Sequence, residues 1–287
     1  MHTQIFHLHA LSALHVGVGQ AVGVVDLPIA RAKATNLPLV PGSALKGVLR
    51  DEFAGDDAGQ ETLFGPDKVR DGDSAFAGAL AFGDAHLLLL PVRSLAGICA
   101  FVTCPFVLAR YGEDLKRAGV EDVPGMPKLA DQAVSLCRQS ALMAKDDLVV
   151  LEDLDLSPAT GEDGEAWGEL IAGRVHADAT WRQALKERFA IVSDDNFSFL
   201  ADTATEIRTR IKINNRGVAE AGALWYEENL PAETVLWGVL GADPARNGAG
   251  QDGMETMSAF RRGIDAGRTI QIGGKATVGR GLVRFIL

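Results

Sequence analysis

The 287-residue sequence predicts a globular protein that contains both strands and helices. Its composition is ordinary for a globular chain, with 47% hydrophobic and 23% charged residues. Apolar residues alternate with a period of two at residues 4–14 and 207–213, which is typical of strands, and recur at helical spacing after Ser43. The length permits one large domain or two small ones.

Cysteine usage and charge indicate the setting of the protein. Three cysteines without a CxxC pair favour a reducing, cytoplasmic compartment. The N-terminus lacks the basic region of a signal peptide, and the most apolar run, residues 95–109, is broken by Pro105 and too short to span a bilayer. A net charge of −10 argues against indiscriminate nucleic-acid binding but permits a local basic groove.

The first predicted strand, residues 4–14, leads through His15 into Gly17 and Gly19. A GxG after a strand is typical of dinucleotide sites when it opens a helix. Here the chain continues as an extended segment at residues 24–28, because Pro28 disfavours a helical residue before it. We therefore do not expect a dinucleotide site.

A helix is predicted to begin after Pro41 and Gly42, with Ser43 as its N-cap. Its apolar face is formed by residues at helical spacing, Leu45, Val48, Leu49 and Phe53. Lys46 and Arg50 are four residues apart and share one edge of this helix.

The surrounding segment, residues 31–50, contains no acidic residue but four cations, Arg31, Lys33, Lys46 and Arg50. Free backbone N–H groups at a helix N-terminus, together with nearby cations, suit a phosphate. An ordinary capped helix with a solvated basic edge explains the segment equally well.

The middle of the chain gives weaker signals. We expect an exposed connection at 51–73, strands at 80–90 and 148–151, a strand pair or strand–helix unit at 92–108, helix-prone residues at 114–145 and a helix at 181–189.

A β-hairpin is predicted at residues 207–226. Arg208, Arg210 and Lys212 alternate with apolar residues and so share one face of a strand. Residues 214–217, Asn-Asn-Arg-Gly, form a strong turn signal, and Trp225 lies near the base of the return strand. A basic face with aromatic residues suits a nucleic acid, although cations that only solubilise the hairpin fit as well.

The C-terminal stretch, residues 270–285, contains a glycine-rich loop. Four glycines surround two cations and a hydroxyl group: Gly273, Gly274, Gly279 and Gly281 surround Lys275, Thr277 and Arg280. Glycine lets backbone N–H groups approach phosphates closely. The cations favour an anion site over an ordinary β-turn.

Several motifs resemble the RAMP superfamily: DLPIxR and PGSxLKGxLR near the N-terminus, the block VSDDNFSFL…TEIRTRIKIN…GALWYEENLP, and the loop GGKATVGRGLV. The helix and loop motifs are shared by several RAMP proteins. VVDLPIAR and SDDNFSFL are more particular and resemble the repeated backbone subunit of the Cmr-type (type III-B) CRISPR effector complex rather than its Csm-type counterpart.

The resemblance implies an α+β fold, namely a ferredoxin-like (RRM-like) palm within a single RAMP domain over residues 1–287. A protruding thumb hairpin would occupy residues 207–227, and a helical insertion would occupy residues 110–185 approximately. No RNP aromatic motif is present, so base stacking on the palm sheet is not expected.

The resemblance also implies a function. Copies of the chain would stack head to tail along a CRISPR guide RNA, together with other subunits of the effector complex, and would cut the base-paired target RNA. Asp26 matches the catalytic aspartate of the family and would hold a divalent metal ion, Mg²⁺ or Mn²⁺; His15 is a candidate helper. The residues expected to bind RNA are Arg31, Gly42, Ser43, Lys46, Arg50, Arg208, Arg210, Lys212, Arg216, Trp225, Gly273, Gly274, Lys275, Thr277, Gly279, Arg280 and Gly281.

Two alternatives stay open at this stage. The chain could be a purely structural guide-binding subunit without nuclease activity. From the residues alone, Asp26 also fits a turn-capping residue or an ion-pair partner of Arg31.

Overall fold

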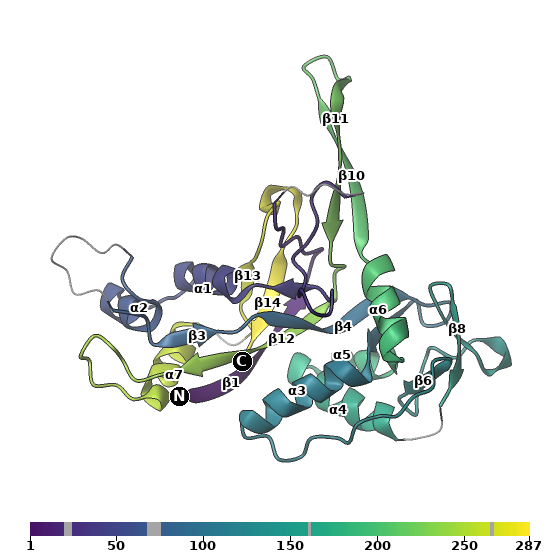
Figure 1. Cartoon of the computed structure of the whole chain (residues 1–287), viewed down its shortest axis with the longest axis horizontal. Coiled ribbons are helices and arrows are strands. Elements are labelled where there is room, and N and C mark those ends of the chain that lie inside the picture. The colour runs from purple at the N-terminus through teal and green to yellow at the C-terminus, as the bar shows by residue number, and fades with distance from the viewer. Residues whose placement is uncertain (20–24, 68–75, 160–161, 265–266) are drawn as a thin grey trace.

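The computed structural model describes residues 1–287 except 20–24, 68–75, 160–161 and 265–266 (Figure 1). The start of the predicted extended segment and the end of the predicted connection at 51–73 lie outside the described residues.

The described part of the chain is organised around β1 (His2–Ala10), which is an inner strand of a large sheet. It pairs antiparallel with β12 (Val235–Ala242) from His2↔Ala242 to His9↔Val235, and on its other edge with β14 (Leu282–Ile286). β13 (Thr269–Gln271) lies beyond β14. The predicted strand at residues 4–14 is confirmed, although it ends at Ala10.

Helices cover both faces of this sheet. On one face, Phe6 of β1 belongs to an aromatic cluster with Phe260 and Phe285 that extends to Phe64. On the other face, the ring of His7 meets Tyr111. The helices of the first face are α1 (Gly42–Asp51), α2 (Asp57–Phe64) and α7 (Gly253–Gly263), and α3 (Pro105–Arg117) lies on the second. Because β1 is covered on both sides, its residues from Phe6 to Ala10 are buried.

The sheet continues from β12 into β4 (Ala85–Arg93) and β5 (Cys99–Thr103), with two short strands, β2 (Leu39–Val40) and β3 (Leu80–Phe82), at its side. α2, with its buried Leu63 and Phe64, replaces part of the connection predicted at 51–73. The prediction missed this helix because the stretch is rich in glycine and acidic residues, and only a few apolar residues at the end of α2 reach the core.

The insertion predicted at 110–185 is not purely helical, which corrects the prediction. It contains α4 (Asp163–Val175) and α5 (Ala179–Lys186), but also β6 (Ala133–Leu136), β7 (Val149–Leu151), β8 (Leu154–Pro158) and a short 3₁₀ turn, η1 (Lys145–Asp147). α3 ends at Arg117 and is followed by Gly119 in the left-handed conformation. β9 (Phe189–Ile191) then returns the chain parallel to β5.

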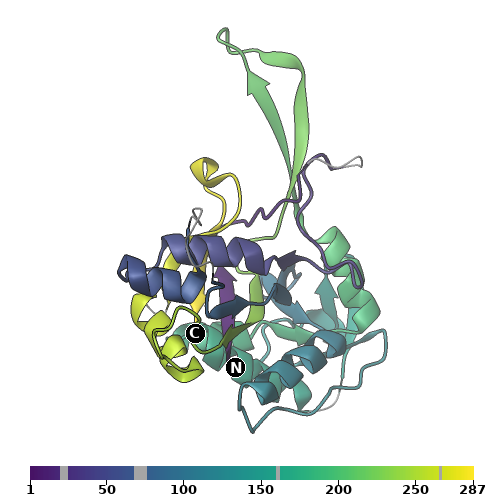
Figure 2. The ribbon, with the colours of Figure 1, turned by 60° about the vertical axis from the view of Figure 1, so that its left-hand side comes forward.

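After β9, α6 (Asp194–Thr203) begins at a Ser193 cap and leads into β10 (Glu206–Ile213) and β11 (Ala219–Asn229). These two strands form a separate antiparallel hairpin that rises away from the rest of the molecule (Figures 1 and 2). The predicted turn is confirmed: the Asn214 side chain accepts hydrogen bonds from the N–H groups of Arg216 and Val218, and Gly217 has a φ of 76°. The hairpin predicted at 207–227 is therefore present.

Candidate nucleic-acid interface

The C-terminal glycine loop, which includes the 3₁₀ turn η2 (Ala276–Val278), lies against the segment that follows β1. Gly274 N–H donates to the His15 carbonyl at 2.9 Å, and Gly281 N–H donates to the Ala13 carbonyl at 2.9 Å. A Cβ at Gly273 would lie 2.3 Å from the His15 carbonyl oxygen, so only glycine fits. At Gly274 and Gly281 the sequence argument was therefore wrong: these N–H groups hold the loop to the protein and are not directed at an anion.

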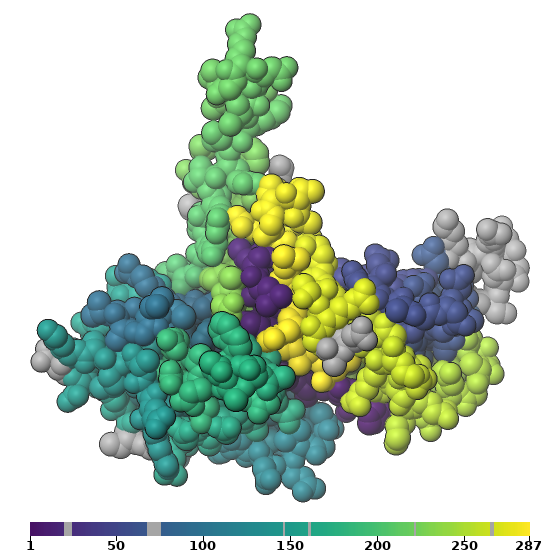
Figure 3. All heavy atoms as spheres, turned by 180° about the vertical axis from the view of Figure 1, so that it is seen from behind, coloured from purple at the N-terminus to yellow at the C-terminus, as the bar shows by residue number. Residues whose placement is uncertain are grey.

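Figure 3 shows the purple N-terminal segment between the yellow loop and the green foot of the hairpin. The same contact is seen in the hydrogen bonds, because His15 meets Gly274 on one side and Glu228 on the other. The structure thus brings together parts of three predicted segments: residues 13–17 after β1, the hairpin base and the glycine loop.

Lys275 and Arg280 differ in their surroundings. Lys275 Nζ lies 3.0 Å from Glu227 Oε1, which joins the loop to β11. Arg280 is buried, and among the described residues its Nε has no hydrogen-bond partner. Thr277 and Gly279 are exposed. A buried guanidinium nitrogen without a partner favours an added acceptor, such as a phosphate oxygen.

Glu227 is a central residue that the sequence reasoning missed. Its side chain is fully buried, and Oε1 accepts the Trp225 indole N–H at 2.8 Å as well as Lys275. Burial alone would raise its pKa, but these two donors and the Arg210 guanidinium, 3.6 Å away, hold the pKa below its usual value. Its position opposite Arg208 depends on the register shift between Ile211 and Ile213, so no local sequence signal pointed to it.

The cations of the hairpin share one face, as predicted, but this face is paired with acids. Arg208 lies 2.7 Å from Glu206, and Lys212 lies 2.8 Å from Glu220. Such exposed pairs are weak, so a phosphate can compete for the cations. Arg216 lies exposed at the turn, and Trp225 is half-buried.

Asp26 and His15 lie along the same edge of β11. Asp26 Oδ2 accepts the Tyr226 N–H at 2.8 Å, and His15 Nδ1 donates to the Glu228 carbonyl at 2.6 Å. Tyr226 and Glu228 are two residues apart in the strand, so their backbone groups point to the same side and their Cα atoms lie roughly 7 Å apart. Asp26 is exposed, whereas His15 is buried.

Gly17 leaves room for the other imidazole nitrogen. A Cβ at this position would lie 2.8 Å from His15 Nε2, which accounts for the first glycine of the GxG. Because Nδ1 donates to a carbonyl oxygen, the neutral ring carries its proton there, and Nε2 is the basic nitrogen.

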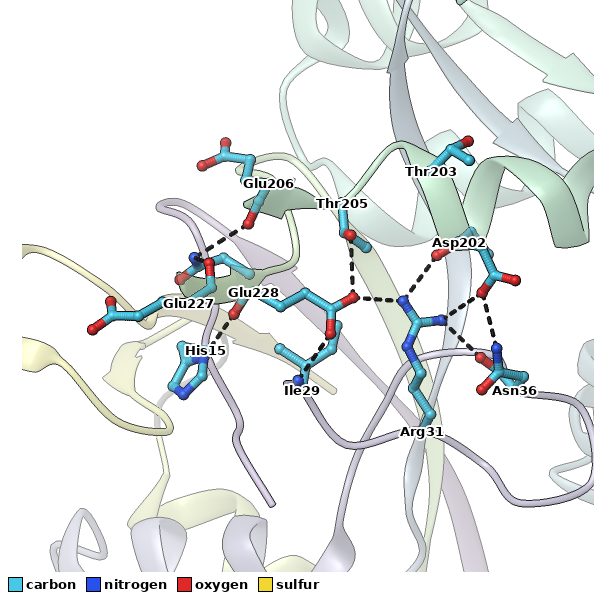
Figure 4. A network of polar contacts seen from close by, with 12 residues as sticks. His15, Ile29, Arg31, Asn36, Asp202, Thr203, Thr205, Glu206, Glu227 and Glu228 are labelled. Carbon is cyan, nitrogen blue, oxygen red and sulfur yellow. Dashed lines mark hydrogen bonds and ion pairs between the residues drawn. The ribbon is translucent and has the colours of Figure 1, made fainter. Parts of the chain in front are cut away.

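Arg31 has a different environment from the one predicted (Figure 4). Its guanidinium donates to Glu228 Oε1 at 2.6 Å, to Asp202 Oδ1 at 3.2 Å and to two backbone carbonyls. Asp26 is not among these partners, so the alternative of an Asp26–Arg31 ion pair was wrong. These four contacts favour a structural role for Arg31 over the predicted RNA contact.

At α1, the apolar face is confirmed, with Leu45 and Leu49 fully buried, but the predicted cap was wrong. Pro41 precedes the helix, Ser43 is exposed, and Gly42 N–H donates to Asp84 Oδ1 at 2.9 Å. A carboxylate from a distant part of the sequence therefore already bonds the first amide of α1. Lys46 and Arg50 are half-buried, and Arg50 lies 3.9 Å from Asp67.

The predicted metal ion would have little protein support. Within the residues that the structure describes, no three His, Cys, Asp or Glu side chains come close enough to hold a metal ion. Asp26 is a single exposed carboxylate, which suits a hard cation only where phosphate oxygens and water complete the shell. No helix among the described residues is long and apolar enough to cross a membrane.

The fold and this site define the class of protein. The RAMP superfamily model matches residues 7–284, so the chain belongs to the RAMP superfamily.

Individual relatives narrow the relationship. The CRISPR system Cmr endoribonuclease Cmr4 of Pyrococcus furiosus is 34% identical over 293 residues, which cover 100% of this chain and 96% of the relative. The crystal structure of oligomeric Cmr4 from the same organism matches with a TM-score of 0.76 at 28% identity, over 100% of this chain and 97% of that one. A chain of the type III-B Cmr-beta complex bound to cognate target RNA shares the fold, with a TM-score of 0.72 at 19% identity, over 100% of this chain and 97% of that one.

These matches confirm the predicted relationship to Cmr-type RAMP proteins and the mixed α/β fold. The ferredoxin-like arrangement of the palm stays a prediction.

Proposed function

We propose that this chain is a guide-RNA-binding backbone subunit of a type III-B effector complex, which also cleaves the paired target RNA. Copies of the chain would follow one another along the guide, beside other subunits of the complex, in the cytoplasm. The relative named endoribonuclease and the crystal structure of an oligomer support this proposal. The free cysteines suit the reducing compartment.

The observation that carries the cleavage step is the position of Asp26 and His15. Both are held on one edge of β11 at the foot of the hairpin, and His15 also lies beside the glycine loop. A single-stranded RNA that follows the loop and meets the hairpin would pass this edge. An exposed carboxylate and an imidazole on the same strand edge can then act on one phosphodiester.

RNA cleavage can use the neighbouring 2′-hydroxyl as nucleophile. His15 Nε2 is the acceptor nitrogen, so His15 can take the hydroxyl proton, while the Glu228 carbonyl fixes the orientation of the ring. Of the two Asp26 carboxylate oxygens, only Oδ2 accepts a hydrogen bond from the described residues. Asp26 would hold the divalent ion, which would supply charge neutralisation at the scissile phosphate.

The test is Asp26→Ala in complexes reconstituted with guide RNA and labelled target RNA. The variant loses one hydrogen bond to the exposed hairpin edge, so its stability should fall by only about 1 kcal/mol. Asp26→Asn keeps an acceptor for Tyr226 N–H but is a poor ligand for a hard cation. We expect guide binding and assembly from both variants, and cleavage reduced by orders of magnitude in both.

The products should carry a 2′,3′-cyclic phosphate, and a chelator should reproduce the defect in the unmutated complex. Wild-type cleavage rates from Asp26→Ala would remove Asp26 from the mechanism. That result would leave the structural, guide-binding subunit as the function of the chain.

A further inference from the structure

Glu228 bonds both His15 and the segment that follows Asp26 in the chain. Its Oε2 accepts the Ile29 N–H at 3.1 Å, and its backbone N–H donates to the Leu27 carbonyl at 3.0 Å. Its own carbonyl accepts His15 Nδ1. One residue thus holds the His15 imidazole and the backbone of Ile29, three residues after Asp26 (Figure 4).

The Glu228 carboxylate is itself held in place by two further residues. Oε1 accepts the Arg31 guanidinium at 2.6 Å and the Thr205 hydroxyl at 3.1 Å, and the side chain is buried. Arg31 then reaches α6 through the Ala201 carbonyl and Asp202. The ion pair connects the Asp26 segment, the hairpin base and α6.

We propose that Glu228, held by its ion pair with Arg31, is a positioning residue for RNA cleavage. It sets where Asp26 and His15 lie relative to each other, and it does not itself touch the RNA. This inference rests on the proposed function. Displacements of about 1 Å at remote supports can cost about 100-fold in rate, so a carboxylate that fixes two reacting groups at once should matter strongly.

The test is Glu228→Gln. Glutamine has one acceptor oxygen, so it cannot serve both the Ile29 N–H and Arg31, and its NH₂ group must face one of these donors. We expect complexes that assemble, hold guide RNA and bind target normally, with a single-turnover cleavage rate at saturating target reduced about 10- to 100-fold.

Asp202→Asn is the matched control, because it removes the charge of the exposed Arg31 partner on α6 without touching the Glu228 contacts. It should cleave at the wild-type rate. Thr205→Val removes one hydrogen bond from Glu228 and should give a rate between those of wild type and Glu228→Gln. If Glu228→Gln complexes fail to assemble, the cleavage rate of Thr205→Val is the measurement that tests the proposal.

A merely structural role predicts fewer assembled complexes with a normal rate per complex, and that result would overturn the proposal. An equal loss of rate in Asp202→Asn would overturn it too, because the effect would then belong to the network as a whole. Asp26→Ala in the same series separates the two hypotheses. Full cleavage by Asp26→Ala refutes the proposed function, whereas lost cleavage there with full cleavage by Glu228→Gln refutes only the positioning role.

Discussion

Replacing Lys275 by alanine should destabilise the protein as well as affect RNA binding. Lys275 Nζ lies 3.0 Å from Glu227, whose side chain is 1% exposed. The substitution leaves a buried carboxylate with only the Trp225 indole and the more distant Arg210. Removing one partner of a fully buried pair costs roughly 3–5 kcal/mol. Two remaining donors, and the 31% exposure of the Lys275 side chain, lower this cost, so we expect about 2–3 kcal/mol.

For a chain of this size, that loss corresponds to a fall in melting temperature of about 4–6 °C. The companion variant is Lys275→Ala with Glu227→Gln. The neutral amide still accepts the Trp225 indole N–H and leaves no unpaired charge in the interior. The double variant should therefore recover at least about 1 kcal/mol of stability relative to Lys275→Ala.

The measurement is thermal or urea unfolding of the single and double variants, with RNA binding followed in parallel. If Lys275→Ala melts like the wild type, or if Glu227→Gln gives no recovery, the pair contributes nothing. Lys275 would then be available to a phosphate, as the sequence predicts.

Three further predictions concern other parts of the molecule. Lys46→Ala with Arg50→Ala should make the salt dependence of guide binding shallower by about two units; a matched α3 double variant, Lys116→Ala with Arg117→Ala, should leave the slope unchanged. Deleting residues 214–217 should leave the melting temperature nearly intact and alter the cleavage pattern, whereas unfolding of the sheet would show that the hairpin is structural. Burial lowers the pKa of His7 from 6.5 to about 3. The stability that the neutral His7 ring contributes is therefore present above pH 6.5 and is lost as the pH falls toward 3, with a loss of about 2 kcal/mol at pH 5. His7→Gln should flatten the pH dependence of the melting temperature.

Local patterns predicted the hairpin well. The alternation at residues 207–213 and the Asn-Asn-Arg-Gly turn act within a few residues, so the sequence contains most of the information needed. The same holds for the buried face of α1. The cap of α1 could not be predicted, because Asp84, rather than Ser43, bonds its first amide from 42 residues away in the chain.

Charge was harder to predict than secondary structure. A run of cations in the sequence indicates a basic face, but Glu206, Glu220 and Glu227 approach that face from the hairpin itself. Arg31 is likewise bound by Glu228 from the base of the hairpin, 197 residues along the chain. Partners at such separations are set by strand register and tertiary packing, which no local pattern contains.

The two ends of the hairpin differ in what holds them. At the base, one edge of β11 pairs with β10 and the other edge bonds His15, Asp26 and Leu27. Farther out, the register shifts between Ile211 and Ile213, which are 49% and 58% exposed. A two-stranded ribbon with apolar side chains in water is only marginally stable, and such exposed apolar surface is typical of a region that a partner covers. The base keeps Asp26 and His15 fixed independently of the outer part, which is why we expect that shortening the turn spares the sheet.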